Sequence, residues 1–245
     1  PVFLVVILIL PANFSTAAII FFMVLLLCFM GGYPMKYLMG IVVTGLVSLT
    51  LFVLVAKAVP DVFPNRVDTW ISRVESFWNP EDTEADYQIE KAKIAIATGG
   101  IVGSGAGKSV MKNFLPQSSS DFIYAIIVEE YGLIGGFAIM FFYLLLLFRI
   151  VVVANGSSSV FGKLLVVGVG LPIVFQALIN MAVAVELFPV TGQTLPLISS
   201  GGTSIWMTCL AIGIVLSASN KNIEEEENAS ELDETNPLEV LSGQL

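Results

Sequence analysis

The chain has 245 residues, of which 56% are hydrophobic and 13% are charged, and its mean hydropathy is +0.88. Soluble domains carry about 45–50% apolar and about 25% charged residues, so this composition excludes an ordinary water-soluble protein and indicates membrane helices. The net charge of −9 comes with no basic patch that would suggest a nucleic-acid partner, and the lack of histidine excludes Ser-His triads and histidine zinc sites.

Six apolar segments predict one partial and five complete membrane spans. The first segment, residues 1–10, is too short, because a span takes roughly 20 apolar residues. It begins at Pro1 inside an apolar run, without Met or a basic n-region, so we expect the C-terminal part of a longer protein. The complete spans are expected at 15–31, 36–58, 121–149, 162–186 and 203–219. Residues 1–219 therefore read as an all-α, polytopic membrane helix bundle.

The distribution of basic residues orients these spans. Alternation of the spans brings four basic residues to one side, namely Lys36, Arg149, Lys163 and Lys221. The opposite loop 187–202 has no Lys or Arg, so the positive-inside rule makes the first side cytoplasmic. We therefore expect an acidic, disordered cytoplasmic tail over 220–245 and a long extracytoplasmic loop over 59–120. Cys28 and Cys209 lie in apolar runs and are interpreted as small apolar residues.

The long loop contains an apolar, glycine-rich stretch over 94–107, flanked by Lys91, Lys93, Lys108 and Lys112. It is too short to span twice, so we expect a re-entrant or surface-lying element over a cavity. A phosphate-binding P-loop ending at Lys108 is excluded, because that motif requires glycine at position 102 and Val102 stands there.

Three acidic residues at the start of the span after this loop are candidates for chemistry. Asp121 follows Ser118 by three residues, which fits a helix capping box, but a partly desolvated carboxylate facing an external cavity would act as a general base. Glu129 and Glu130 lie deeper, where a carboxylate either faces a cavity or forms an interhelical hydrogen bond or ion pair.

Two further sets of residues could bind a ligand. Arg73, Lys91, Lys108 and Lys112 either belong to a solvated loop balanced by its acids or clamp a phosphate or pyrophosphate. Residues 188–204 either form a tight turn or bind a sugar or peptide head group through their Thr, Ser and Gln side chains.

A set of motifs in fixed order carries a family resemblance. The motifs are Arg73-Val-Glu-Ser-Phe-Trp-Asn-Pro80, Tyr87-Gln88, the glycine run through Gly107, Leu115-Pro116 followed by Asp121-Phe122-Ile123, Glu129-Glu130-Tyr-Gly132, Pro189-Val-Thr-Gly192, Thr194-Leu-Pro-Leu-Ile-Ser199 and Gly201-Gly202. In this order they resemble the SEDS (RodA/FtsW) family of peptidoglycan glycosyltransferases, and more the FtsW cell-division branch than RodA.

The resemblance implies an inverting enzyme that polymerises lipid II at the outer face of the bacterial inner membrane. It makes Asp121 the catalytic residue that acts on the acceptor hydroxyl. The residues expected to bind substrate are Arg73, Lys91, Lys108, Lys112, Glu130, Gln193, Thr194 and Ser199. It also implies a class B penicillin-binding protein and other divisome or elongasome membrane proteins as partners. A divalent cation, Mg²⁺ or Mn²⁺, at the pyrophosphate is an expectation for which the sequence offers no ligand cluster.

Several positions depart from the family pattern. Ser119 and Ser120 precede the aspartate where many members have His-Thr, and Asn13 stands where an acid is common. Thr191 and Ser200 replace residues that are often lysine and tyrosine. The competing functions are a lipid-linked precursor transporter or flippase, suggested by carboxylates near membrane depth, and a non-catalytic scaffold for a transpeptidase.

Overall fold

The computed structural model describes residues 2–58, 69–70, 72–73, 77–78, 84–116 and 118–234. Within these residues the fold is all-helical. The long helices are α2 (Phe14–Met30), α3 (Met35–Ala58), α6 (Ile123–Gly156), α7 (Val160–Ala184) and α8 (Gly202–Glu234). The shorter elements are α1 (Val2–Ile9), α5 (Glu84–Gly99) and the 3₁₀ turn η1 (Met111–Asn113).

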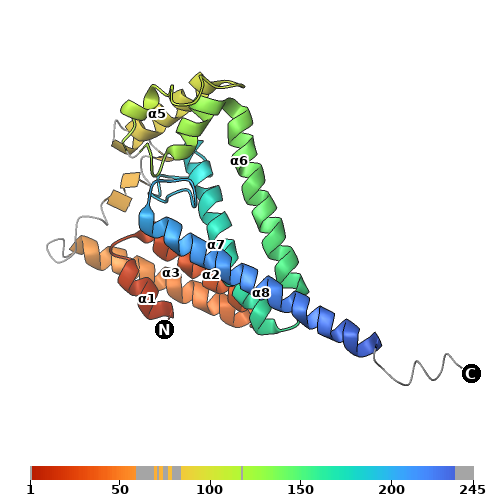
Figure 1. Cartoon of the computed structure of the whole chain (residues 1–245). Coiled ribbons are helices and arrows are strands. Elements are labelled where there is room, and N and C mark those ends of the chain that lie inside the picture. Colours follow the sequence, from red (N-terminus) through yellow and green to blue (C-terminus); the bar gives the residue numbers. More distant parts are fainter. Residues whose placement is uncertain are drawn as a thin grey trace, which may run out of the picture.

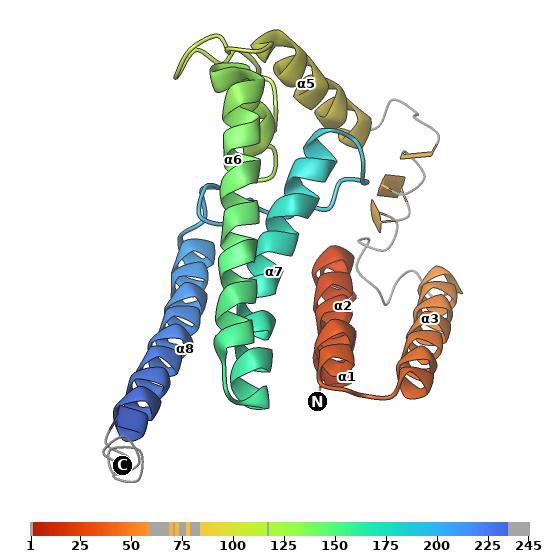
Figure 2. The same ribbon diagram turned by 90° about the vertical axis from the view of Figure 1, so that its right-hand side faces the viewer.

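Helix α7 is the centre of the bundle. Helices α2, α6 and α8 all pack against it, whereas α3 packs on α2 and α5 lies across one end of α6. Figure 2 shows the resulting order α8, α6, α7, α2 and α3 across the molecule, and Figure 1 shows α5 at one end of it. The bundle therefore has a cap at the end where α5 lies.

Four helices are long and apolar enough to cross a membrane, over Met35–Val55, Ile123–Gly156, Val160–Ala184 and Gly202–Asn220. The shorter apolar helix α2 is at the lower limit of the usual range of about 17–25 residues. The prediction of a polytopic membrane helix bundle is thereby confirmed.

The boundaries differ from the sequence prediction mainly at two helix ends. Helix α6 ends at Gly156, seven residues beyond the expected 149. Helix α8 continues to Glu234, so the first part of the expected disordered tail is helical, in keeping with its many Glu residues. Residues 235–245 lie outside the described part, and disorder there stays a prediction.

Helix α6 is broken at Gly132, which has φ 70° and ψ −173°. An unbroken helix would bond the amides of residues 133 and 134 to the carbonyls of residues 129 and 130. Instead, Leu133 N–H donates to Gly100 O at 2.9 Å and Ile134 N–H donates to Ile101 O at 3.3 Å.

The two carbonyls released by the break are satisfied by the same loop. Ser104 N–H donates to Glu129 O at 3.0 Å, and Gly105 N–H donates to Glu130 O at 2.9 Å. A Cβ atom at Gly103 would collide with the Glu130 carbonyl, so only glycine permits this approach. The glycine-rich stretch thus docks, main chain against main chain, into a gap in α6.

Candidate active site

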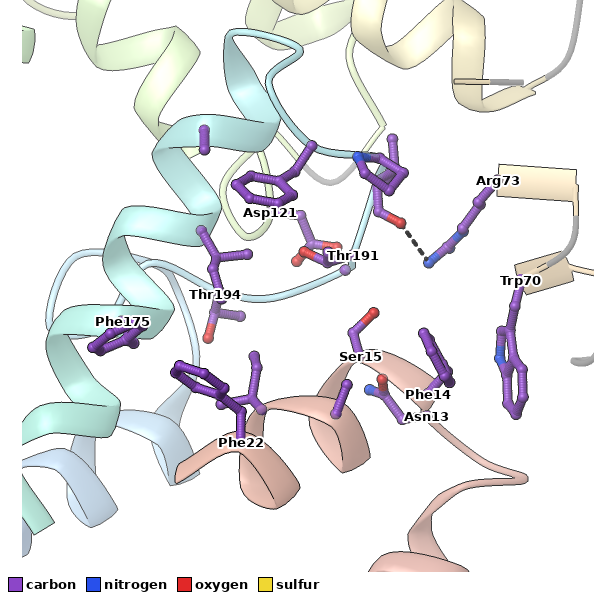
Figure 3. A pocket seen from close by; sticks show the side chains of 18 of the residues that line it. Asn13, Phe14, Ser15, Phe22, Trp70, Arg73, Asp121, Phe175, Thr191 and Thr194 are labelled. Atoms are coloured by element: carbon purple, nitrogen blue, oxygen red, sulfur yellow. Dashed lines mark hydrogen bonds between the residues drawn. The ribbon is translucent and has the colours of Figure 1, made fainter. Parts of the chain in front are cut away.

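A cavity of about 1360 Å³ lies between α2 and α7 and extends to the loop 188–194 (Figure 3). This volume is larger than the usual range for small-molecule sites, about 300–1,000 Å³. One part is polar and includes Asn13, Arg73, Ser120, Asp121, Thr191 and Thr194. The remainder is apolar and includes Ile19, Phe22, Met23, Phe175, Leu178 and Ile179. The cavity therefore suits an amphipathic ligand with a polar head.

Asp121 stands half-buried just before α6, with its carboxylate at the cavity. Its Oδ1 accepts a hydrogen bond from Ser120 Oγ at 2.5 Å. Phe122 is the N-cap residue of α6, and within the described residues no side chain caps this end of the helix. The capping interpretation of Asp121 is therefore not supported, and its carboxylate remains available to a ligand.

The backbone around Asp121 is fixed by a buried amide on α7. Asn180 is 1% exposed, and its Nδ2 donates to Asp121 O and to Gln193 O, both at 2.7 Å. Asn180 thus joins the start of α6 to the loop that follows α7. Its Oδ1 is buried and has no partner among the described residues.

Serine hydroxyls fix the same loop from its other end. Ser199 is 3% exposed; its Oγ accepts from Leu195 N–H at 2.7 Å and donates to Ser120 O at 2.6 Å. Ser200 donates to Ser119 O through both its amide and its hydroxyl, each at 2.9 Å. The two serines that replace the family's His-Thr therefore serve as main-chain acceptors for this loop.

Arg73 brings a positive charge to the polar part of the cavity. Its Nη1 donates to Val190 O at 3.4 Å, the bond drawn in Figure 3. A Cβ atom at Gly192 would lie 3.6 Å from Asp121 Oδ2 and 3.7 Å from Arg73 Nη1, so the two side chains flank the same residue. Neither group has an ion-pair partner within the described part of the chain. The cavity therefore presents an anion and a cation side by side, both available to a ligand.

Aromatic residues line the edges of the cavity. Trp70 contacts Phe14 of α2 with ring centroids 5.4 Å apart, near Arg73. Phe22 of α2 and Phe175 of α7 meet at 5.7 Å in the apolar part, and all four rings are labelled in Figure 3. These pairs bridge elements that are distant in sequence, so periodicity alone does not reveal them.

The structure brings three of the nine predicted site residues together at the cavity, namely Asp121, Arg73 and Thr194. Gln193 and Ser199 are adjacent but bond within the protein: Gln193 Nε2 donates to Thr16 Oγ1 at 3.0 Å, which ties this loop to α2. Thr194 accepts from Gln176 Nε2 through its carbonyl at 3.0 Å and its hydroxyl at 3.2 Å.

The other four predicted ligands do not line the cavity. Lys91 lies 3.6 Å from Glu90 and 5.0 Å from the ring centroid of Tyr87 on α5. Lys108 and Lys112 are exposed on the loop, and Glu130 is half-buried beside the break in α6. Any role for these four in binding substrate stays a prediction.

Glu129 has a structural role in the described chain. It is 1% exposed, and its carboxylate accepts from Ser109 Oγ at 2.5 Å, Val110 N–H at 2.9 Å and Met111 N–H at 3.3 Å. It therefore holds the start of η1, which agrees with the hydrogen-bond alternative stated for it above.

The chain is similar in sequence and in fold to known proteins. Residues 1–224 match the profile of a cell cycle protein family named for FtsW, RodA and SpoVE. The chain is 35% identical over 218 residues to the probable peptidoglycan glycosyltransferase FtsW of Coxiella burnetii, which covers 85% of this chain and 55% of that protein. It is 38% identical over 152 residues to stage V sporulation protein E of Bacillus subtilis, which covers 61% of this chain and 42% of that protein.

A solved structure from work titled "Structural coordination of polymerization and crosslinking by a peptidoglycan synthase complex" has a similar fold. It superposes with a TM-score of 0.63 and 28% identity, covering 89% of this chain and 59% of that one. The chain spans about half the length of the curated relatives it matches.

Proposed function

The chain belongs to the FtsW/RodA/SpoVE family of cell cycle proteins, and we propose that it is part of an inverting peptidoglycan glycosyltransferase that polymerises lipid II. The observation that carries the proposal is the cavity in which an available carboxylate and an available guanidinium adjoin an apolar groove. Lipid II has the matching parts: a sugar hydroxyl, a pyrophosphate and a polyprenyl chain.

In the proposed reaction, a GlcNAc hydroxyl of the acceptor attacks the anomeric carbon of the donor, and the bond to undecaprenyl pyrophosphate breaks. Asp121 accepts the hydroxyl proton as a general base. Arg73 pairs with the departing pyrophosphate, for which a guanidinium fork is well suited. The groove between Phe22 and Phe175 accommodates the polyprenyl chain.

We propose separately that a divalent cation binds at the pyrophosphate. Mg²⁺ is often held by one or two carboxylates together with substrate phosphates. Asp121 is the one carboxylate in the described lining, and it is already assigned to proton transfer. The proposed reaction therefore includes no step that takes place on a metal ion.

The chain is a multi-pass membrane protein, and we place it in the bacterial cytoplasmic membrane. The asymmetry of Lys and Arg supports an extracytoplasmic face for Asp121 and a cytoplasmic side for the tail. A class B penicillin-binding protein is the partner that we propose, together with other divisome or elongasome membrane proteins. The similarity to a structure of a peptidoglycan synthase complex supports this choice of partner.

The experiment is polymerisation of lipid II by the full-length protein with its transpeptidase, comparing wild type with Asp121→Asn. Loss of a general base costs about 10²–10⁴-fold in rate, and we expect a fall in that range without loss of folding. Glu90→Gln is the matched control, because Glu90 is an exposed acid on α5 away from the cavity. Full polymer yield from well-folded Asp121→Asn would refute the proposal.

The same assay separates the competing functions. A transporter would move lipid II across vesicles without making polymer, and a scaffold would tolerate Asp121→Asn. Two of the three carboxylates that suggested transport, Glu129, Glu130 and Glu186, have partners: Glu129 bonds the loop and Glu186 forms an ion pair with Lys93. Transport is therefore the weaker alternative.

A further inference from the structure

Two aliphatic residues form the tip of the loop that docks at the break in α6. Ile101 is 68% exposed and Val102 is 75% exposed, in a segment whose main-chain groups at residues 100, 101, 104 and 105 are hydrogen-bonded to α6. Gly100 and Gly103 flank the pair and both have positive φ, 53° and 88°. Because its main chain is bonded to a helix, this tip is held at a fixed height relative to α6.

The height of the tip relative to a bilayer follows from the length of α6. The part of α6 after the break, residues 133–156, is about 36 Å long at about 1.5 Å per residue. The hydrocarbon core of a bilayer is about 30 Å thick, so the break emerges at a membrane surface. Figures 1 and 2 show the loop after α5 at this end of α6, on the side away from α2 and α3 in Figure 2.

The tip also continues an apolar surface on α6. Ile134, whose amide bonds to Ile101 O, is 61% exposed, and Phe137 and Phe141 are each 60% exposed. These three residues recur at helical spacing within a candidate span, as expected for a face that contacts lipid tails. Lys108 folds back over Gly105, where its Nζ would lie 3.8 Å from an added Cβ, so an ammonium stands two residues beyond Gly103 in the same loop.

We propose that residues 100–103 are a membrane anchor, with Ile101 and Val102 inserted among the lipids of the leaflet at this end of α6. The observations that carry it are the two exposed aliphatic side chains, their fixed attachment at the membrane-surface end of a span, and their continuity with its apolar face. The occupant of the surface is a phospholipid leaflet, with Lys108 at the level of the phosphate groups. This inference does not depend on the proposed reaction.

Site-directed spin labelling of the full-length protein in phospholipid vesicles tests the anchor. The label is attached at Val102→Cys, with Ile101→Cys as a second position, after Cys28→Ala, Cys209→Ala and replacement of any cysteine in the rest of the full-length protein. Glu90→Cys is the water-exposed control, because Glu90 lies on the same cap and carries a charge. Power saturation then compares accessibility to oxygen, which enriches in lipid, with accessibility to a water-soluble nickel chelate.

We expect labels at 101 and 102 to favour oxygen over the nickel chelate, and the label at 90 to show the reverse. Nickel accessibility at 101 and 102 equal to that at 90 would overturn the anchor, because the tip would then project into water. Labels shielded from both reagents would also overturn it, since protein rather than lipid would cover the tip.

Discussion

The buried carboxylate of Glu129 bonds three donors of the loop between α5 and α6, so its removal should release that part of the loop. In Glu129→Leu, three donors lose their acceptor: Ser109 Oγ, Val110 N–H and Met111 N–H. An unsatisfied buried donor costs about 1–3 kcal/mol, and partial access of water to Val110 lowers the total to about 3 kcal/mol. Because each 1.4 kcal/mol is about tenfold, local opening should rise about 100-fold.

Trypsin provides the assay, since Lys108 and Lys112 lie in the loop that would open. Cleavage of a transiently opened segment follows its population when opening is fast, so the cleavage rate should rise by the same factor. Glu129→Gln keeps an acceptor for the two amides and should cost about 1 kcal/mol. Glu130→Leu is the matched control, because its carboxylate has no partner among the described residues. Equal cleavage rates for the Leu variants at 129 and 130 would refute the reasoning.

Two further predictions address the break in α6 and the groove. Gly132→Ala should lower the free energy of unfolding by more than about 3 kcal/mol, because its Cβ would collide with the Ile101 carbonyl and its backbone conformation is essentially restricted to glycine. Gly202→Ala is the control: a Cβ there meets open space, so its free energy of unfolding should stay within about 0.5 kcal/mol of wild type. Thermal unfolding measures both. Ala18→Trp should fill the groove and slow polymerisation about 10–100-fold with thermal unfolding unchanged. Ala138 is also exposed but lies on α6 outside the cavity, so Ala138→Trp should not slow polymerisation. Equal polymerisation rates for the two variants would contradict a ligand in the groove.

The bundle could be predicted from the sequence because apolar spans of this length have few alternatives in a membrane. The positions of Asp121 and Arg73 at one cavity could not be derived from spacing, since they come from segments 48 residues apart that, in the described part of the chain, meet at the loop after α7. The family resemblance, and not periodicity, carried that part of the prediction.

Other parts of the site escaped prediction for a related reason. Asn180 is not among the predicted site residues, yet it joins two main-chain segments at Asp121. Its burial within an apolar helix is the signal, because a buried amide requires hydrogen-bond partners. Three of the predicted ligands outside the cavity, Lys91, Lys108 and Lys112, were grouped by charge, and charge does not specify which side of a loop a residue occupies. The fourth, Glu130, was predicted from the family resemblance.

The gap in α6 is closed mainly by amides and carbonyls of a neighbouring segment, residues 99–105. Two kinds of side-chain requirement enter that pairing: glycine at Gly99, Gly103 and Gly132, and the hydroxyl of Ser104, which donates to Glu129 O at 2.7 Å. Substitutions at Ile101 and Val102, whose side chains are exposed, can therefore accumulate without altering the path of residues 99–105. Chimeras that exchange residues 99–105 between distant homologues should assemble, provided that the glycines and the Ser104 hydroxyl are retained. The joint between this loop and α6 therefore depends mainly on main-chain geometry, which different sequences can share.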